Sequence, residues 1–295
     1  MKKLLIASTA LVATAGMATA DITMSGYAEI GMVDYGTAVG MEMHSDMDVT
    51  FKLSGASDNG LTFGASIDLD EVSNGIASTG GPHAVHVSGG FGTLTMGDTD
   101  GALDKANAEV ASLTAIADDH TAHSGYNGGA GLDSGDILRY DTTYNGFGIS
   151  ASLAQSDVAV ANDVIAYGIT TTLGTVALSA AYQDNNTQDI TAVSAKSTVG
   201  GLGITANYSE ATMGTNATSY EHTGVGLAYT LNGVNLHANY GVYDFDDGTN
   251  ADGYGLAANY GLGGGATVMV GYGNGTAQGA TADVTTFSVG LGLSF

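Results

Sequence analysis

Two histidines in the segment around residue 120 stand beside a pair of carboxylates. His120 and His123 are three residues apart and follow Asp118 and Asp119, and imidazole with carboxylate is a ligand set that divalent metals accept. The segment has no regular periodicity, so this spacing fixes no coordination geometry. Solvated loop residues explain the pattern better than a metal centre does.

Signatures of the common catalytic chemistries are missing from the sequence. It contains no cysteine, no G-x-S-x-G nucleophile elbow, no phosphate-binding P-loop and no dinucleotide fingerprint. Most carboxylates fall in polar stretches, where nothing desolvates them enough to tune them for acid–base chemistry. The sequence therefore predicts a protein that is not an enzyme.

One short element, GGAGLD at residues 128–133, matches the G-G-x-G-x-D unit of calcium-binding β-rolls. A roll needs neighbouring copies to complete each site, and this single copy is better interpreted as a flexible loop. Looser calcium binding by loop carboxylates stays open, because hard cations take oxygen ligands. The candidate ligands are Asp244, Asp246, Asp247 and Asp252. The pattern requires no cofactor.

The composition limits the elements that could position any site. Of the 295 residues, 46 are glycine, 15 are tyrosine and one is proline, and only 12% are charged. Soluble domains carry roughly 25% charged residues. Acidic residues number 30 against six basic ones, and such a polyanion repels nucleic acid and attracts cations. We therefore expect no nucleic-acid partner.

The first 20 residues have the three parts of a secretory signal peptide. Lys2 and Lys3 form the positive start, an apolar stretch follows at 4–12, and Ala18-Thr19-Ala20 is a cleavage site of the A-x-A type. We expect cleavage before Asp21, export from a bacterial cell, and a mature domain at 21–295. The lack of cysteine in an exported chain argues against a disulfide-stapled domain.

Alternation of apolar with small or polar residues dominates the mature sequence. It is clear in LTFGASIDL (61–69), FGISASL (147–153), VNLHANYGV (234–242) and the terminal FSVGLGLSF (287–295). A period of two is typical of β-strands. Segments of about nine to eleven residues suit tilted strands that cross a bilayer.

Short and long connections alternate between these segments. The short ones contain Asn-Gly, Gly-Gly or related pairs, which accept the positive φ of tight hairpins. The seven short turns lie at residues 57–60, 89–92, 144–146, 173–175, 199–203, 231–233 and 261–265. The eight longer polar stretches lie near residues 35–46, 70–82, 98–135, 155–163, 183–189, 209–219, 244–253 and 273–283. These connections predict sixteen strands, with both termini on the short-turn side.

The two faces of the strands predict a barrel rather than a soluble sandwich. The polar face carries charges in neighbouring strands, and unpaired charge cannot be packed in a dry core. A closed antiparallel β-barrel of sixteen strands, with lipid outside and water inside, satisfies both faces and leaves no open edge. The predicted lumen-wall residues are Glu29, Asp48, Lys52, Asp68, Asp70, Arg139, Asp141 and Lys196.

Tyrosines recur on the apolar face near strand ends, as in LSAAY, ITANY and LAANY. Amphipathic rings prefer the membrane–water boundary, so they predict an aromatic girdle; cross-strand tyrosines of a soluble sandwich are the alternative. The girdle residues are Tyr182, Tyr208, Tyr229, Tyr240, Tyr260, Tyr272 and Phe295. We expect the last strand to pair with the first and so to order the C-terminus.

The stretch at 98–135 is far longer than the other connections, and long loops in compact folds are usually functional. Residues 102–116 have some helical tendency, and Leu103, Val110 and Leu113 could pack against the barrel wall. Folded inward, the loop would narrow the channel and present its carboxylates to water. These carboxylates are Asp98, Asp100, Asp104, Glu109, Asp118 and Asp119.

The mature chain resembles the general-diffusion porins of Gram-negative outer membranes, closest to the alphaproteobacterial, Rhodobacter-like type. The resemblance lies in ITMSGYAEIGM (22–32), LTFGASIDL, LTMGDTDGALDKA (94–106) and FSVGLGLSF. It implies a trimeric sixteen-stranded barrel in the outer membrane, with the third external loop as a constriction. It also implies outer-membrane lipid and the barrel-assembly machinery as partners, the latter through the terminal aromatic.

In that family, acidic residues on the constriction loop face basic residues on the opposite wall. The acidic side is carried over onto Asp98, Asp100, Asp104 and Glu109, whereas Glu29 stands where relatives often have a basic residue. The resemblance therefore implies passive diffusion of small hydrophilic solutes with cations preferred over anions. A secreted calcium-binding β-roll or adhesin and a substrate-specific outer-membrane channel are the alternatives.

Overall fold

The computed structural model describes residues 20–70, 83–111, 113–117, 123–126, 136–155, 162–214 and 217–295. The predicted signal peptide lies outside these residues except for Ala20, as do Asp118, Asp119, His120 and the GGAGLD element. Among the described residues, no helix is long and apolar enough to cross a membrane.

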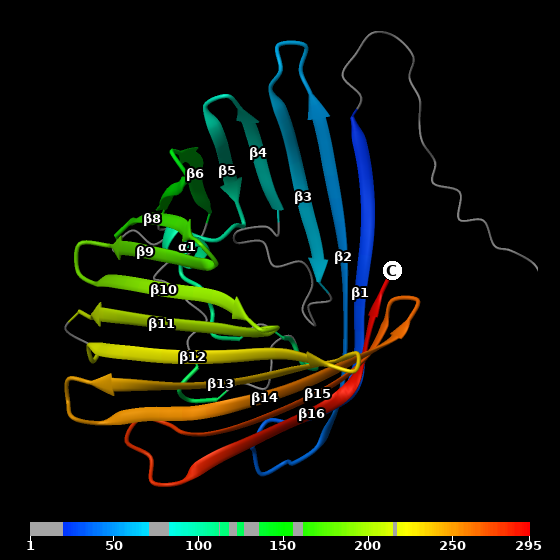
Figure 1. Ribbon diagram of the computed structural model, residues 1–295, viewed down its shortest axis with the longest axis vertical. Helices are drawn as coiled ribbons and strands as arrows, with labels where there is room; N and C mark the ends of the chain where they lie inside the picture. The colour runs from blue at the N-terminus through cyan, green and yellow to red at the C-terminus, as the bar shows by residue number, and fades with distance from the viewer. Residues whose placement is uncertain are drawn as a thin grey trace, which may run out of the picture.

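Sixteen antiparallel strands close into a barrel, and a short helix lies in the longest connection (Figure 1). The elements are β1 (Asp21–Asp34), β2 (Glu42–Ala56), β3 (Thr62–Asp70), β4 (His83–Gly89), β5 (Gly92–Gly97), α1 (Ala102–Ala106), β6 (Ile137–Tyr144), β7 (Phe147–Ala154), β8 (Val164–Leu173), β9 (Val176–Asp184), β10 (Asp189–Val199), β11 (Leu202–Thr212), β12 (Tyr220–Leu231), β13 (Val234–Phe245), β14 (Asn250–Gly263), β15 (Ala266–Thr276) and β16 (Asp283–Ser294). The predicted strand number is confirmed, and the closed barrel excludes the β-roll alternative.

The C-terminus forms the closing seam that the sequence predicts. β16 pairs with β1, with Leu291 opposite Ile30, and the Phe295 N–H donates to the Gly26 carbonyl at 2.8 Å. This pairing leaves neither β1 nor β16 as an open edge, which the interior of a membrane would not tolerate.

Tight turns form where Asn-Gly pairs were predicted to place them. Asn145 and Gly146 have φ of 49° and 82°, and Asn232 and Gly233 have φ of 51° and 84°. Two successive positive φ values suit a two-residue hairpin between twisted strands.

The strands run further toward the long-loop side than the alternation of apolar residues predicts. β2 already begins at Glu42, and the predicted loop at 209–219 is shortened because β11 continues to Thr212. Backbone pairing extends these strands past the apolar band, since Glu210 still pairs with Glu221 on the next strand. Hydrogen bonding between neighbours, which apolar patterning does not report, sets the strand ends.

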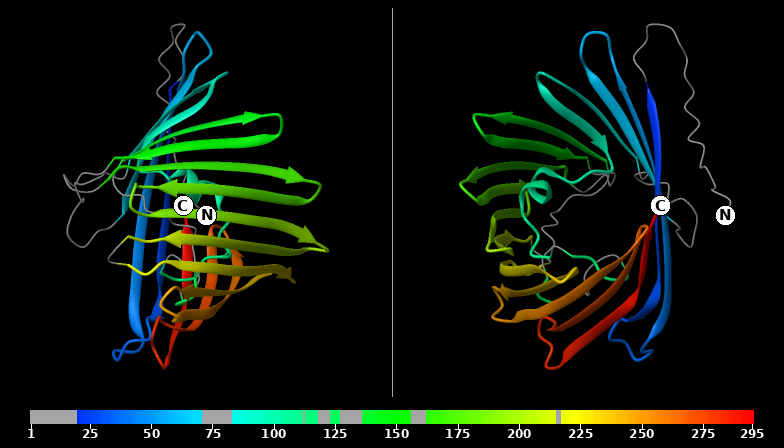
Figure 2. Two further views of the ribbon diagram at one scale, coloured as in Figure 1. Left: turned by 90° about the vertical axis from the view of Figure 1, so that its left-hand side faces the viewer. Right: turned by 45° about the vertical axis from the view of Figure 1, so that its right-hand side comes forward.

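Buried apolar residues gather where the long loop meets the wall rather than at the centre of the barrel. Leu103 from α1 packs with Ala166, Ala181 and Ile190, and Ile116 packs with Val33 and Met269. In the right-hand view of Figure 2 the strands form a ring, and α1 with the segment after it lies inside.

Candidate functional site

The strand register divides each strand into an outer and an inner face. Large apolar side chains such as Met43 (90% exposed), Ile22 and Tyr167 point outward, and the residues between them point into the barrel. The predicted wall residues whose register places them on the inner face are Glu29, Asp48, Lys52, Asp68, Arg139, Asp141 and Lys196. The side chain of Asp70 lies outside the described residues.

The first part of the long loop is hydrogen-bonded to inner-face side chains. The backbone N–H of Ala102 donates to Ser152 Oγ at 2.8 Å, and that of Ala108 donates to Ser194 Oγ at 2.9 Å. Asn207 Nδ2 donates to the Ala108 carbonyl at 3.1 Å. The two bonds at Ala108 explain why the helix ends at Ala106 instead of continuing through the predicted stretch at 102–116. The wall satisfies the backbone groups that a longer helix would have paired internally.

Farther along the loop, Glu29 on β1 anchors the loop backbone. Its Oε2 accepts the Ala117 N–H at 2.8 Å, and its Oε1 accepts the Tyr27 hydroxyl at 2.8 Å. Glu29 is only 1% exposed. It lies on the inner face as predicted, but it does not line open water, because the loop covers it. A second anchor in this region is Asn259 Nδ2, which donates to the Thr114 carbonyl at 2.9 Å.

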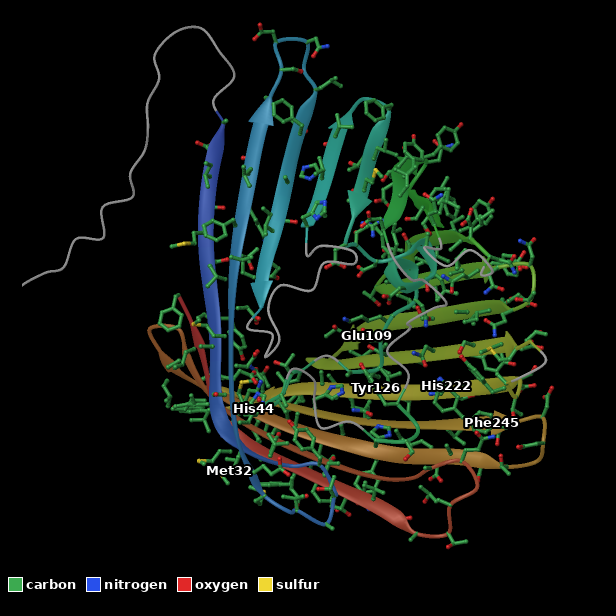
Figure 3. The ribbon with its side chains drawn as sticks, turned by 180° about the vertical axis from the view of Figure 1, so that it is seen from behind. Met32, His44, Glu109, Tyr126, His222 and Phe245 are labelled. Carbon is green, nitrogen blue, oxygen red and sulfur yellow. The ribbon has the colours of Figure 1, made fainter. Side chains whose placement is uncertain are left out.

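The segment at 123–126 is held by β12 and β13. His222 Nε2 lies 2.9 Å from the Gly125 carbonyl, and the Tyr243 hydroxyl donates to the Tyr126 carbonyl at 3.2 Å. His123 Nε2 is 2.5 Å from Asn239 Oδ1, so this histidine serves as a wall contact in the structure. Figure 3 labels His222 and Tyr126 at this contact.

Glycines on the inner face let the loop approach the strand backbone. A Cβ at Gly226 would lie 1.7 Å from the Val110 carbonyl oxygen, and one at Gly241 would lie 2.2 Å from that of Gly125. A Cβ at Gly168 would lie 2.5 Å from the Ala102 carbonyl oxygen. We call the wall formed by the inner faces of β1, β7, β8 and β10–β14 the docking arc. Close approach of two backbones is a recognised use of glycine.

The described loop carboxylates differ in exposure. Asp98, Asp100 and Glu109 are exposed, and Asp104 is half-buried on α1. The Tyr126 hydroxyl donates to Glu109 Oε2 at 3.4 Å, and both residues are labelled in Figure 3. The loop therefore contacts the wall through its backbone and presents its acidic side chains to the lumen.

Two of the basic side chains, Arg139 and Lys105, are paired with the same carboxylate. Arg139 is 8% exposed; its Nε donates to Asp141 Oδ2 at 3.0 Å and its Nη1 to Thr99 Oγ1 at 2.9 Å. It also donates to the Asp100 carbonyl, so it fastens the start of the loop. Lys105 Nζ lies 3.2 Å from the same Asp141 Oδ2. Lys52 and Lys196 are exposed on the inner face.

Sequence patterning missed some inner-face residues. The apolar alternation places Asp46 in the loop at 35–46, yet this residue pairs with Glu29 across β1 and β2. His44 lies on the same face with Nε2 3.5 Å from Glu29 Oε2. Extending the alternation of β2 toward its start would have found both residues. The role of Asn207, Asn259 and Ser194 as loop anchors has no such signal, because a polar inward residue looks the same whether it contacts water or backbone.

The predicted girdle residues lie on the outer face. The exposed members are Tyr182, Tyr208, Tyr229, Tyr240, Tyr260 and Phe295. Tyr272 is partly covered, with its ring centroid 6.0 Å from that of Tyr254. An outward tyrosine near a strand end suits the membrane boundary.

The aspartates proposed for calcium are not gathered into a site. Among the described residues, no three His, Cys, Asp or Glu side chains cluster as metal ligands. In the turn after β13, the hydroxyl and N–H of Thr249 hold the pKa of Asp247 below its ordinary value. Asp244 and Asp252 lie on outward-facing positions of β13 and β14. Calcium binding stays an untested prediction.

The sequence and the fold of this chain are both similar to those of known proteins. A family model described as Gram-negative porin matches residues 7–280. A porin from Rhodobacter capsulatus is 26% identical over 284 residues, which are 85% of this chain and 93% of that protein. A porin structure refined at 1.8 Å superposes with a TM-score of 0.73 at 22% identity, covering 93% of this chain and all of the other. OmpT of Vibrio cholerae, with loop L8 deleted, gives a TM-score of 0.71 at 14% identity, covering 94% and 99% of the two chains.

Proposed function

The chain belongs to the Gram-negative porin family and forms an outer-membrane channel, and from this premise we propose that the channel prefers cations to anions. Small hydrophilic solutes diffuse through it passively. The loop at 98–135 is the constriction, with its narrowest part shaped by the carboxylates Asp98, Asp100, Asp104, Glu109, Asp118 and Asp119.

The distribution of charge around the lumen carries this proposal. After signal cleavage only four basic residues remain against 30 acidic ones, and Arg139 and Lys105 both bind Asp141. The inner face of β2 and β3, which we call the open arc, carries Asp46, Asp48 and Asp68. Carboxylates on both the loop and the open arc lower the energy of a cation in the lumen and raise that of an anion.

Planar-bilayer recording in a KCl gradient tests the proposal. The wild-type channel should conduct ohmically, with a reversal potential of the cation-selective sign. A variant with Asp98→Asn, Asp100→Asn, Asp104→Asn and Glu109→Gln should move the reversal potential toward zero, because four lumen charges are removed. An anion-selective wild type would contradict the charge argument.

A matched control separates lumen charge from total charge. Glu210, Glu221, Asp244 and Asp252 occupy outward-facing positions of β11–β14. Neutralising these four residues removes the same charge as the loop variant, yet it should leave the reversal potential close to that of the wild type. Equal shifts in the two variants would show that the loop carboxylates do not form the constriction.

We further propose that the mature chain starts at Asp21 and assembles as a homotrimer. β1 begins at Asp21, the residue after the predicted cleavage site. The outward faces of β1–β5 carry methionines such as Met24, Met43 and Met47 but no tyrosine, whereas tyrosines mark the outward faces of β6, β8, β9 and β11–β15. A side that lacks boundary tyrosines fits contact with neighbouring subunits. Intact-mass measurement and cross-linking of the purified protein test these two proposals.

A further inference from the structure

Two adjoining cavities lie on the inner wall beside α1, toward the short-turn end of β6–β10. Their volumes are about 400 Å³ and 560 Å³. Ala106, Gly148 and Thr170 line both, so the cavities form one continuous hollow. Volumes of roughly 300–1,000 Å³ are typical of sites for small organic ligands. Ser194, which accepts the Ala108 N–H, borders the second cavity, so the hollow adjoins an anchor of the loop.

Hydroxyl groups in the hollow are available to a ligand. Thr143, Thr170 and Thr172 line it from inward-facing positions, and among the described residues no hydrogen bond engages their hydroxyls. Gly148 keeps Thr170 uncovered, because a Cβ at this position would lie 2.5 Å from Thr170 Oγ1. These threonines differ from Ser194, whose hydroxyl the loop already occupies.

The hollow is also the positive region of an acidic lumen. Lys105 lines one cavity and Lys196 the other. Asp141 neutralises only part of the positive charge of Arg139 and Lys105, because these two side chains share this one carboxylate. Lys196 is exposed and has no ion pair among the described residues. Both ammonium groups can therefore donate to a bound anion.

We propose that this hollow retains small polyhydroxylated carboxylates, such as sugar acids, during their passage. The ammonium group of Lys196 binds the carboxylate, and the hydroxyls of Thr170, Thr172 and Thr143 bind the hydroxyls of the ligand. A charge-assisted hydrogen bond is stronger than a neutral one, so the carboxylate sets the affinity. The inference rests on the channel function but not on the cation preference, because a local site can retain an anion in a lumen that repels anions on average.

Single-channel recording with gluconate as the probe tests the site. Gluconate should interrupt the KCl current of the wild-type channel, whereas glucose and acetate at the same concentration should interrupt it much less. Lys196→Gln should weaken the apparent affinity for gluconate about tenfold, as expected for the loss of one charge-assisted hydrogen bond. Thr170→Val and Gly148→Ala should weaken it less, because each removes or covers one neutral hydroxyl.

Lys52→Gln is the matched control, because Lys52 is an exposed inward lysine on β2 and does not line the hollow. This change should leave the gluconate interruptions unchanged. Gluconate interruptions that survive Lys196→Gln would overturn the proposal, and so would equal interruption by glucose. The proposal would also fail if gluconate did not interrupt the current of a wild-type channel that conducts KCl. Lack of any KCl conductance in the wild type would instead contradict the channel function.

Discussion

The docking arc and the open arc carry the same alternating pattern but use their inward polar groups differently. On the docking arc, Ser194, Asn207 and Glu29 are buried and bind the loop backbone. On the open arc, Lys52 and Asp68 are exposed to the lumen, and Asp68 accepts a hydrogen bond at 3.1 Å from Thr50 of the neighbouring strand. One arc therefore fixes the shape of the passage, and the other sets its charge.

The largest effect should come from filling the closest contact of the docking arc. Gly226→Val places a branched side chain where a single Cβ already lies 1.7 Å from the Val110 carbonyl oxygen. Overpacking of this kind costs about 1–3 kcal/mol, and the loop is tied at both sides of Val110, so it should move into the lumen. We expect lower single-channel conductance and a lower melting temperature.

Gly203→Ala provides the control for that change. Gly203 is also an inward glycine, on β11, but a Cβ there would lie 3.4 Å from its nearest neighbour, Ala228 Cβ. Its conductance should match that of the wild type. If Gly226→Val conducts normally, the loop does not lie against β12 in the membrane.

A smaller effect should follow from removing the Glu29 anchor. Glu29→Ala leaves the Ala117 N–H and the Tyr27 hydroxyl without their acceptor, and an unpaired buried donor costs about 1–3 kcal/mol. The end of the loop should loosen, which would appear as added noise in the open-channel current and faster proteolysis within the loop. Glu29→Gln keeps a carbonyl acceptor and should be milder. Identical behaviour of the two variants would contradict the anchoring role.

Substitutions on the open arc should have the smallest effect on the structure. They should nevertheless change the ion selectivity clearly. Asp46→Asn, Asp48→Asn and Asp68→Asn together should reduce the cation preference, because three inward carboxylates are lost. Conductance should stay within about twofold, and thermal stability should change little, since surface substitutions usually alter stability by at most about 0.5 kcal/mol. Reversal potential and thermal melting measure the two effects. A large loss of stability would show that the open arc is structural as well.

Most of the fold could be predicted from the sequence, whereas only part of the site could. Alternation and the Asn145-Gly146 and Asn232-Gly233 pairs predict the strands and turns, because side-chain direction and turn geometry depend on near neighbours in the chain. The inward direction of Lys52, Arg139 and Lys196 follows from the same period. Asp46 was missed because the polar start of β2 looks like a loop until its pairing with β1 is known.

The sequence by itself determined the barrel, its sixteen strands, the closing seam at Phe295 and the acidic character of the lumen. All four depend on local periodicity or on composition. Only the tertiary structure decided which inward groups meet water. Glu29 is covered by the loop and binds its backbone, and Arg139 binds the start of the loop. Both do so because a segment far away in sequence lies against them. A contact between distant segments depends on how the loop packs inside the closed barrel, which no local pattern encodes.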